Sequence, residues 1–376
     1  MRVEPTVPAE VLAGIRGVLA SAGAETIDAP ILQPLNLLLE LVGEAMRARL
    51  FVVQAEGGAE ECLRPDFTVA VARAHIERGA AEGRYAYEGP AFRAAPEGEE
   101  PEQFVQLGVE RFAAQGSPMV EADVEMTGLA WGASRAGGRE DLTLWLGDVG
   151  LFAAFIESLS LPPTLAARLR RVAGRPRLLA AELGRAGEAP QRAEAGQLAT
   201  MLAGLEASKA AGLLEEVWAL AGIEPVGGRG PAEIAARLVR RAEAASAPSL
   251  TASQAAAIGA FMAISDTPAE GLRQVRALAG GGVGIAAALE AWDARLGALG
   301  EVAPVAAMRF APALGHAFDY YDGITFEVRS EALGPERPVA SGGRYDGLLE
   351  RLGGQAGGRA VGCVVRPWRA FAGGES

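Results

Sequence analysis

The sequence predicts an α+β fold into which an all-helical segment is inserted. Near the start, residues 9–21 carry apolar side chains at helical spacing, which is typical of a helix with one buried face. Strand-like stretches follow, among them 142–146, where residue character alternates. From about 151 to 304 the composition changes to Ala, Leu, Arg and Glu, without any tyrosine, and prolines and glycines separate helical repeats. We therefore expect a core in two parts, 1–150 and 305–376, with a helical insertion at 151–304.

Composition and charge exclude several kinds of function. The chain has 376 residues and a net charge of −12, with 47 acidic against 35 basic residues, whereas RNA-binding proteins usually show a basic face. Lys209 is the single lysine, and no phosphate-binding P-loop surrounds it. Cys62 and Cys363 are too far apart in the sequence for a metal-binding motif, so we expect both to be buried thiols. With no run of about eighteen apolar residues and no signal pattern, we expect a soluble cytoplasmic protein without membrane segment, metal or cofactor.

The stretch around Asp322-Gly323 predicts a β-hairpin. Ala317–Tyr321 and Ile324–Val328 are rich in aromatic and β-branched residues, and the Asp-Gly pair between them favours a type I′ turn. Because side chains alternate along a strand, we expect the adjacent Tyr320 and Tyr321 to point to opposite faces. The pattern alone favours a sheet hairpin with one buried tyrosine.

Two polar residues mark a second candidate site, in the strand-like stretch that ends near residue 112. Gln106 and Glu110 are four residues apart, so on a strand they face the same side. Burying two polar side chains on one face is costly unless something forms hydrogen bonds with them. The stretch therefore fits either a solvent-facing strand or a site for a polar ligand.

Asp66 also allows two interpretations, which are compatible with each other. It precedes a helical run through Val69, Ala72 and Ile76, where its carboxylate would cap the first turn. The other interpretation is a ligand-binding role for Asp66 and Thr68, and it rests on a family resemblance.

Several stretches resemble the histidyl-tRNA synthetases, and they occur in the order found in that family. The similar stretches are Leu63–Thr68, Tyr87–Phe112, Asp319–Glu327, Ala340–Leu349 and Ala360–Arg369. The helix and strand of residues 9–30 resemble the first motif of class II aminoacyl-tRNA synthetases, which forms the dimer interface there. The resemblance implies a class II synthetase-like antiparallel sheet flanked by helices, and a homodimer.

The same resemblance implies a site for histidine. In the synthetases, the residues that match Asp66 and Thr68 hold the α-amino group, and the match of Arg93 contacts the carboxylate. The residues that match Gln106 and Glu110 also contact bound histidine. The implied site consists of Asp66, Thr68, Arg93, Gln106, Glu110, Tyr320 and Tyr321.

Three positions depart from the synthetase pattern. His316 stands in the place of the family's catalytic arginine, Ala95 in that of a glutamate that helps to hold adenine, and Trp368 in that of the third-motif glutamate. Neutral histidine is a poor substitute for a guanidinium, which is always charged and binds oxyanions through two donors. The residues for amino-acid binding are thus largely kept, whereas those for activation are not.

The loop near residue 100 and the end of the sequence depart as well. The loop is acidic and would repel ATP and tRNA, since four of six positions are Glu97, Glu99, Glu100 and Glu102. The sequence ends seven residues after Arg369, which matches the third-motif arginine, so we expect no anticodon-binding domain.

A histidine site without activation chemistry resembles the ATP phosphoribosyltransferase regulatory subunits, a family of synthetase paralogues. The resemblance implies a non-catalytic subunit required for the first step of L-histidine biosynthesis, with L-histidine as the feedback effector. It also implies a homodimer within a hetero-oligomer with the short-form ATP phosphoribosyltransferase catalytic subunit, and no binding of tRNA. The alternatives are a truncated histidyl-tRNA synthetase-like ligase that activates histidine, and a free-standing histidine-binding module with another partner.

Overall fold

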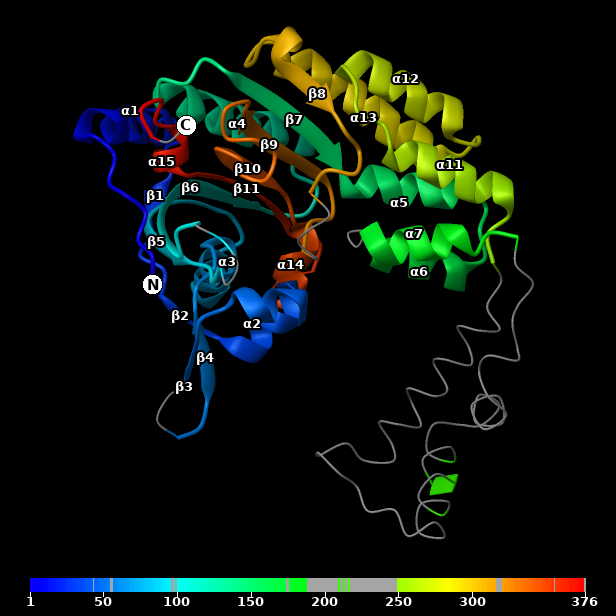
Figure 1. Ribbon diagram of the computed structural model, residues 1–376, viewed down its shortest axis with the longest axis horizontal. Coiled ribbons are helices and arrows are strands. Elements are labelled where there is room, and N and C mark those ends of the chain that lie inside the picture. Colours follow the sequence, from blue (N-terminus) through cyan, green and yellow to red (C-terminus); the bar gives the residue numbers. More distant parts are fainter. Residues whose placement is uncertain are drawn as a thin grey trace. The chain divides into compact units, whose positions relative to one another are not determined.

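The computed structural model divides into two compact units (Figure 1). The first unit comprises Met1–Leu159, Ala173–Arg175 and Ala260–Ser376, and the second comprises Ser160–Val172 and Pro176–Gly259. The described residues are 1–42, 44–54, 57–95, 98, 100–173, 176–187, 209, 212–213, 216, 249–315, 320–354 and 356–374.

The core of the first unit is an eight-stranded sheet in the order β1-β5-β6-β11-β10-β9-β7-β8. The pairs from β5 to β7 are antiparallel, whereas β1 with β5 and β7 with β8 are parallel. This arrangement confirms the predicted α+β fold with an antiparallel sheet. The strands are β1 (Glu25–Thr26), β5 (Gly83–Phe92), β6 (Gln103–Ala113), β7 (Leu142–Asp148), β8 (Met308–Phe310), β9 (Ile324–Ser330), β10 (Ala340–Arg344) and β11 (Arg359–Val365).

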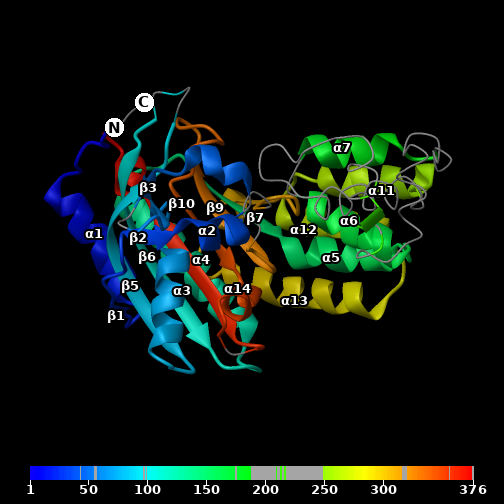
Figure 2. The same cartoon turned by 90° about the horizontal axis from the view of Figure 1, so that it is seen from below.

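Helices cover both faces of this sheet, because its strands direct alternate side chains to opposite sides (Figure 2). On one face α4 (Met119–Ala136) packs against β9, β10 and β11, and α1 (Ala9–Ala20), the predicted first helix, packs against α4. On the other face α2 (Leu35–Val42), α3 (Thr68–Glu77) and α14 (Asp346–Arg351) share a buried core with β5 and β6. Adjacent residues of β6 show the division, since Arg111 pairs with Glu125 of α4 while Phe112 stacks on His75 of α3.

The remaining elements of the first unit are short strands and helices around this sheet. A small antiparallel sheet has the order β2-β4-β3. Its strands are β2 (Leu32–Pro34), β3 (Val52–Gln54) and β4 (Glu60–Leu63). The other helices are η1 (Glu44–Arg49), α5 (Val149–Ser158), α12 (Pro268–Leu278), α13 (Val283–Leu299), η2 (Val305–Ala307) and α15 (Pro367–Ala370), and α13 packs against both α4 and α5.

The described part of the second unit is helical. It contains α6 (Pro163–Val172) and α7 (Pro176–Gly184), which contact each other, and most of α11 (Ala252–Met262). Most of residues 188–248, where the sequence predicts further helices of the insertion, lie outside the described residues.

The predicted hairpin around Asp322-Gly323 is wrong in its first strand. β9 forms as expected, but β10 and β7 pair with its two edges, so no edge is left for a preceding strand. Tyr320 and Tyr321 lie outside any strand, and their ring centroids are 4.8 Å apart instead of on opposite faces. Residues 317–319 lie outside the described part of the chain.

Two simpler expectations can be compared with the structure. Cys62 and Cys363 are buried free thiols, as predicted. Within the described residues, none of the helices has the length and apolar character needed to cross a membrane.

Candidate functional site

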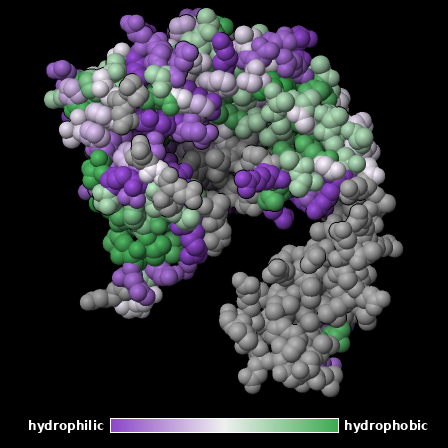
Figure 3. Space-filling view, in the orientation of Figure 1, coloured by the Kyte–Doolittle hydropathy of each residue, from purple (hydrophilic) through white to green (hydrophobic). Residues whose placement is uncertain are grey.

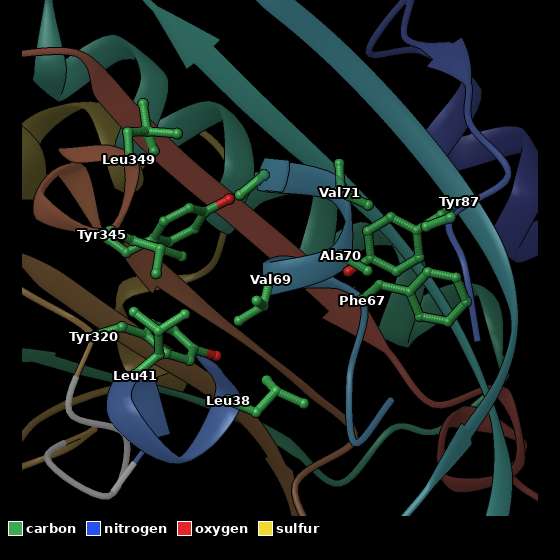
Figure 4. Close-up of a cluster of buried hydrophobic side chains, with 14 of the residues drawn as sticks. Leu38, Leu41, Phe67, Val69, Ala70, Val71, Tyr87, Tyr320, Tyr345 and Leu349 are labelled. Carbon is green, nitrogen blue, oxygen red and sulfur yellow. The ribbon is translucent and has the colours of Figure 1, made fainter. Parts of the chain in front are cut away.

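Most of the predicted histidine-binding residues meet on the face of the sheet that α3 covers. Gln106 and Glu110 point from β6 to this face, while Asp66 and Thr68 lie at the beginning of α3. Phe67 between them stacks on Tyr87 of β5 with ring centroids 4.3 Å apart (Figure 4). The period-two argument for β6 therefore selected the correct face, and that face is buried instead of solvent-exposed.

Glu110 is the centre of a buried hydrogen-bond network. Its Oε1 accepts hydrogen bonds from Thr68 Oγ1 at 2.9 Å and from the Tyr87 hydroxyl at 3.3 Å, and its Oε2 accepts one from the Tyr345 hydroxyl. Burial raises the pKa of Glu110 to about 7, and the three hydroxyl donors partly oppose this increase. The carboxyl group thus has a fixed orientation and changes its charge near neutral pH.

The backbone opposite Glu110 must approach the carboxyl group closely. Gly362 of β11 is the direct partner of Glu110 across the antiparallel pair. A Cβ at this position would lie 1.5 Å from Glu110 Oε2, so only glycine leaves room for the carboxyl group. Gly362 is therefore required for the position of the Glu110 carboxyl group.

Asp66 and Gln106 carry buried oxygens that form no hydrogen bond. Asp66 is 7% exposed and Gln106 is 2% exposed, and neither Asp66 carboxylate oxygen nor Gln106 Oε1 has a hydrogen-bond partner among the described residues. Burial raises the pKa of Asp66, and the charge of Arg93, with Nη2 at 3.9 Å from Oδ2, lowers it. Buried acceptors without partners are costly, so these oxygens are suited to receive donors from a ligand.

The capping role predicted for Asp66 is met only in its electrostatics. The residue at the N-cap of α3 is Phe67, whose side chain forms no capping hydrogen bond. The backbone amides of Thr68 and Val69 in the first turn lower the pKa of the preceding Asp66, although neither of its carboxylate oxygens has a hydrogen-bond partner among the described residues. The carboxylate of Asp66 can therefore still accept hydrogen bonds from a ligand.

Tyrosines form one side of the site. The ring centroid of Tyr320 is 4.8 Å from that of Tyr321 and 6.0 Å from that of Tyr345, and Figure 4 shows Tyr320 and Tyr345 near each other. Burial, and then the nearby charges of Asp66 and Glu110 among other groups, raise the pKa values of Tyr320 and Tyr321. These hydroxyls are therefore neutral at physiological pH and can act as donors or acceptors.

Arg93 is positioned by the segment that leads into α3. Its Nε donates a hydrogen bond to the carbonyl oxygen of Pro65 at 2.9 Å, and its guanidinium lies over the ring of Phe104 at 5.5 Å. These contacts direct a cation towards Asp66, where it can meet a ligand carboxylate.

Sequence reasoning missed Tyr87 and Tyr345 as members of the site. Tyr345 lies in the Gly343-Arg344-Tyr345-Asp346 stretch, which resembles the synthetases, but the resemblance did not assign a function to this tyrosine. Tyr87 was harder to identify from the sequence. Its hydrogen bond to Glu110 depends on the strand register, in which Tyr87 pairs with Gly108.

The chain matches one family along most of its length. A family model described as histidyl-tRNA synthetase matches residues 7–225 and 231–367. The ATP phosphoribosyltransferase regulatory subunits of Mesorhizobium japonicum and Brucella anthropi are each 34% identical to it. These matches cover 94% and 91% of this chain and 95% and 91% of the two relatives. The chain belongs to the histidyl-tRNA synthetase-like family of ATP phosphoribosyltransferase regulatory subunits.

Two solved structures with histidyl-tRNA synthetase in their descriptions have a similar fold. An ATP phosphoribosyltransferase regulatory subunit/histidyl-tRNA synthetase from Bacillus halodurans C matches with a TM-score of 0.68 at 21% identity, over 100% of this chain and 83% of that chain. A histidyl-tRNA synthetase from Nostoc sp. PCC 7120 matches with a TM-score of 0.58 at 15% identity, over 99% of this chain and 75% of that chain.

Two of the three positions that depart from the synthetase pattern are described. Ala95 has no side-chain carboxylate. Its backbone carbonyl oxygen accepts a hydrogen bond from Arg2 Nη2 at 2.7 Å. Trp368 is half-buried and lines a recess beside Arg369. His316 lies outside the described residues.

Proposed function

We propose that this protein is the regulatory subunit of an ATP phosphoribosyltransferase and that the buried polar site around Glu110 binds L-histidine as a feedback effector. The observation that carries the histidine site is the pair of buried side chains, Asp66 and Gln106, whose oxygens have no hydrogen-bond partner in the described part of the chain. Family membership supports the regulatory role.

The site has complementary groups for each part of a histidine zwitterion. The carboxylate of Asp66 and Oε1 of Gln106 can accept from the α-ammonium group, and Arg93 can donate to the α-carboxylate. An imidazole N–H can donate to Glu110, whose orientation Tyr345 and two other donors maintain. Aromatic rings around the carboxylates suit the flat ring of the ligand.

We propose that the protein does not catalyse a reaction by itself. Ala95 and Trp368 lack the carboxylates expected of a histidine-activating enzyme, and His316 lacks the fixed charge of an arginine. The proposed partner is the short-form ATP phosphoribosyltransferase catalytic subunit, and we expect no binding of tRNA. As a member of a biosynthetic family, the protein is proposed to work in the cytoplasm.

A homodimer within the larger complex is part of the proposal. In the first unit, the small β2-β4-β3 sheet and the residue before it carry exposed apolar side chains, namely Ile31 at 43%, Leu32 at 42% and Val52 at 48% exposure. Figure 3 shows a hydrophobic area over this part of the unit. Apolar patches of this kind commonly mark protein interfaces. Ile31 and Leu32 directly follow the stretch of residues 9–30, which resembles the dimer motif, and this adjacency supports a homodimer.

Reconstitution with a short-form catalytic subunit tests the function. The protein should raise the rate of phosphoribosyl-ATP formation, and L-histidine should reverse that increase. Glu110→Gln should keep the activation and weaken the inhibition, whereas Glu88→Gln, the same change at a surface pair with Arg16, should leave both unchanged. Co-elution without a change in turnover would contradict the mechanism, and failure to associate would favour a histidine-binding module with another partner.

The description of the matching family model favours one alternative, a histidine-activating ligase. Such an enzyme would exchange pyrophosphate into ATP when histidine is present. We expect no such exchange and no charging of tRNA from the purified protein. A robust rate of exchange would overturn the regulatory proposal in favour of the ligase.

A further inference from the structure

Asp322 connects two segments that carry tyrosines of the proposed histidine site. Its Oδ1 accepts a hydrogen bond from the backbone amide of Asp346 at 3.0 Å, and its Oδ2 accepts one from that of Gly347 at 2.6 Å. The backbone amide of Asp322 donates to the carbonyl oxygen of Arg344 at 3.0 Å. Three hydrogen bonds therefore attach residue 322 to the chain on both sides of Tyr345.

The first turn of α14 is capped from outside the helix. The first amides of a helix have no acceptor within it, and the side chain of the N-cap residue, Tyr345, forms no capping hydrogen bond. That side chain instead donates a hydrogen bond to Glu110 Oε2. The carboxylate of Asp322 satisfies two of the amides, so the start of α14 is held while the Tyr345 hydroxyl is directed to Glu110.

The tyrosines that precede Asp322 pack against the same part of the first unit. The ring centroid of Tyr320 lies 6.0 Å from that of Tyr345. A Cβ at Gly343 would lie 2.9 Å from Tyr321 Cε1, so the Tyr321 ring rests directly on the backbone of β10. The segment before Asp322 is therefore packed both on β10 and beside the start of α14.

Strand pairing places the Tyr321 ring on the same face of the sheet as Glu110. Gly343 of β10 is the direct partner of Gly362 in β11, and Gly362 is the direct partner of Glu110 in β6. Residues that lie directly opposite each other on paired strands face the same side of a sheet. The rings on both sides of the Asp322 connection thus lie on the face that carries Glu110.

We propose that Asp322 is a positioning residue of the histidine site, which sets the spacing between the Tyr320–Tyr321 segment and Tyr345. While its carboxylate holds the start of α14, the Tyr345 hydroxyl keeps its direction towards Glu110, and the three rings keep their places beside the ligand. Asp322 itself is exposed, so it acts on the geometry of the site and not by filling the core. The expected change in histidine affinity rests on the proposed function, whereas the expected change at Glu110 does not.

Asp322→Ala tests the proposal through the affinity for L-histidine. Calorimetry of the full chain at pH 8 should show binding weakened about tenfold, because the donor to Glu110 is no longer held in place. Asp322→Asn keeps one acceptor oxygen, so its Kd should lie between those of wild type and Asp322→Ala. The matched control is Asp141→Ala, since the carboxylate of Asp141 also accepts from a backbone amide, that of Ala332, beyond the opposite end of β9. The control should leave Kd unchanged, and equal losses in both alanine variants would overturn the proposal.

A measurement without histidine separates this proposal from the proposed function. The hydrogen bond from Tyr345 lowers the pKa of Glu110, so Asp322→Ala should raise this pKa, as Tyr345→Phe should. Carbon-13 NMR titration of the glutamate carboxyl groups measures the change, and Glu110→Gln identifies the resonance. A raised pKa in a protein that does not bind histidine would contradict the histidine site and support the role of Asp322. An unchanged pKa of Glu110 in Asp322→Ala would overturn that role, whether or not histidine binds.

The double variant Asp322→Ala/Tyr345→Phe decides whether Asp322 acts through Tyr345. If it does, adding Asp322→Ala to Tyr345→Phe should change the Kd for L-histidine by less than about twofold and leave the pKa of Glu110 where Tyr345→Phe puts it. Fully additive effects would overturn the route through Tyr345. A lower Tm of Asp322→Ala with an unchanged Kd and an unchanged pKa of Glu110 would show that Asp322 only stabilises the fold.

Discussion

Replacing Glu110 by glutamine should change how the stability of the protein depends on pH. The pKa of Glu110 is raised to about 7 by burial, from an ordinary value of 4.5. The folded state therefore binds a proton more tightly than the unfolded state, so wild-type stability falls as pH rises from about 4.5 to about 7 and then levels off. Glutamine has nearly the same shape but cannot ionise, so the stability of Glu110→Gln should not fall over this pH range.

The size of the effect follows from the two pKa values. At 1.36 kcal/mol per pKa unit the full difference is about 3 kcal/mol, most of which falls between pH 5 and pH 8. The free energy of unfolding of Glu110→Gln minus that of wild type should therefore increase by about 2–3 kcal/mol over this range. Urea unfolding of both proteins at pH 5, 6, 7 and 8, without histidine, measures it. A difference that stays constant within about 0.5 kcal/mol would refute the reasoning, because the carboxyl group would then not be titrating in this window.

Three further predictions concern the same site. L-Histidine at about 100 times Kd should stabilise the protein by about 2.7 kcal/mol, and L-histidinol should stabilise it less because Arg93 would lose its carboxylate partner; equal shifts in Tm would argue against that role of Arg93. Tyr345→Phe removes the donor to Glu110 Oε2 and should weaken histidine binding by about tenfold, since a hydrogen bond to a charged group contributes about 1.5–3 kcal/mol; an unchanged Kd in calorimetry at pH 8 would contradict this. Gly362→Ala should cost about 1–3 kcal/mol in urea unfolding, because the added Cβ meets Glu110 Oε2. The control is Gly17→Ala in α1, where the added Cβ meets nothing within 4 Å. A similar change in stability for both variants would show that the contact between residue 362 and Glu110 does not require glycine.

The strand pattern of β6 shows how far local reasoning extends. The spacing of Gln106 and Glu110 placed both side chains on one face, and the structure buries that face under α3. This succeeded because alternation along a strand is a property of the backbone and needs no knowledge of neighbouring strands. The same rule failed for Tyr320 and Tyr321, since it requires a strand and the two edges of β9 are already paired with β10 and β7.

The sequence by itself determined the α+β class, the first helix and the shared face of Gln106 and Glu110, because local periodicity carries this information. Only the tertiary structure decided which groups surround Glu110. Tyr87 reaches Glu110 from β5, Tyr345 from the start of α14, and Gly362 from β11, and a long stretch of chain separates Tyr87 from the other two. Strand register brings them together, and register depends on the packing of the whole sheet rather than on any one segment.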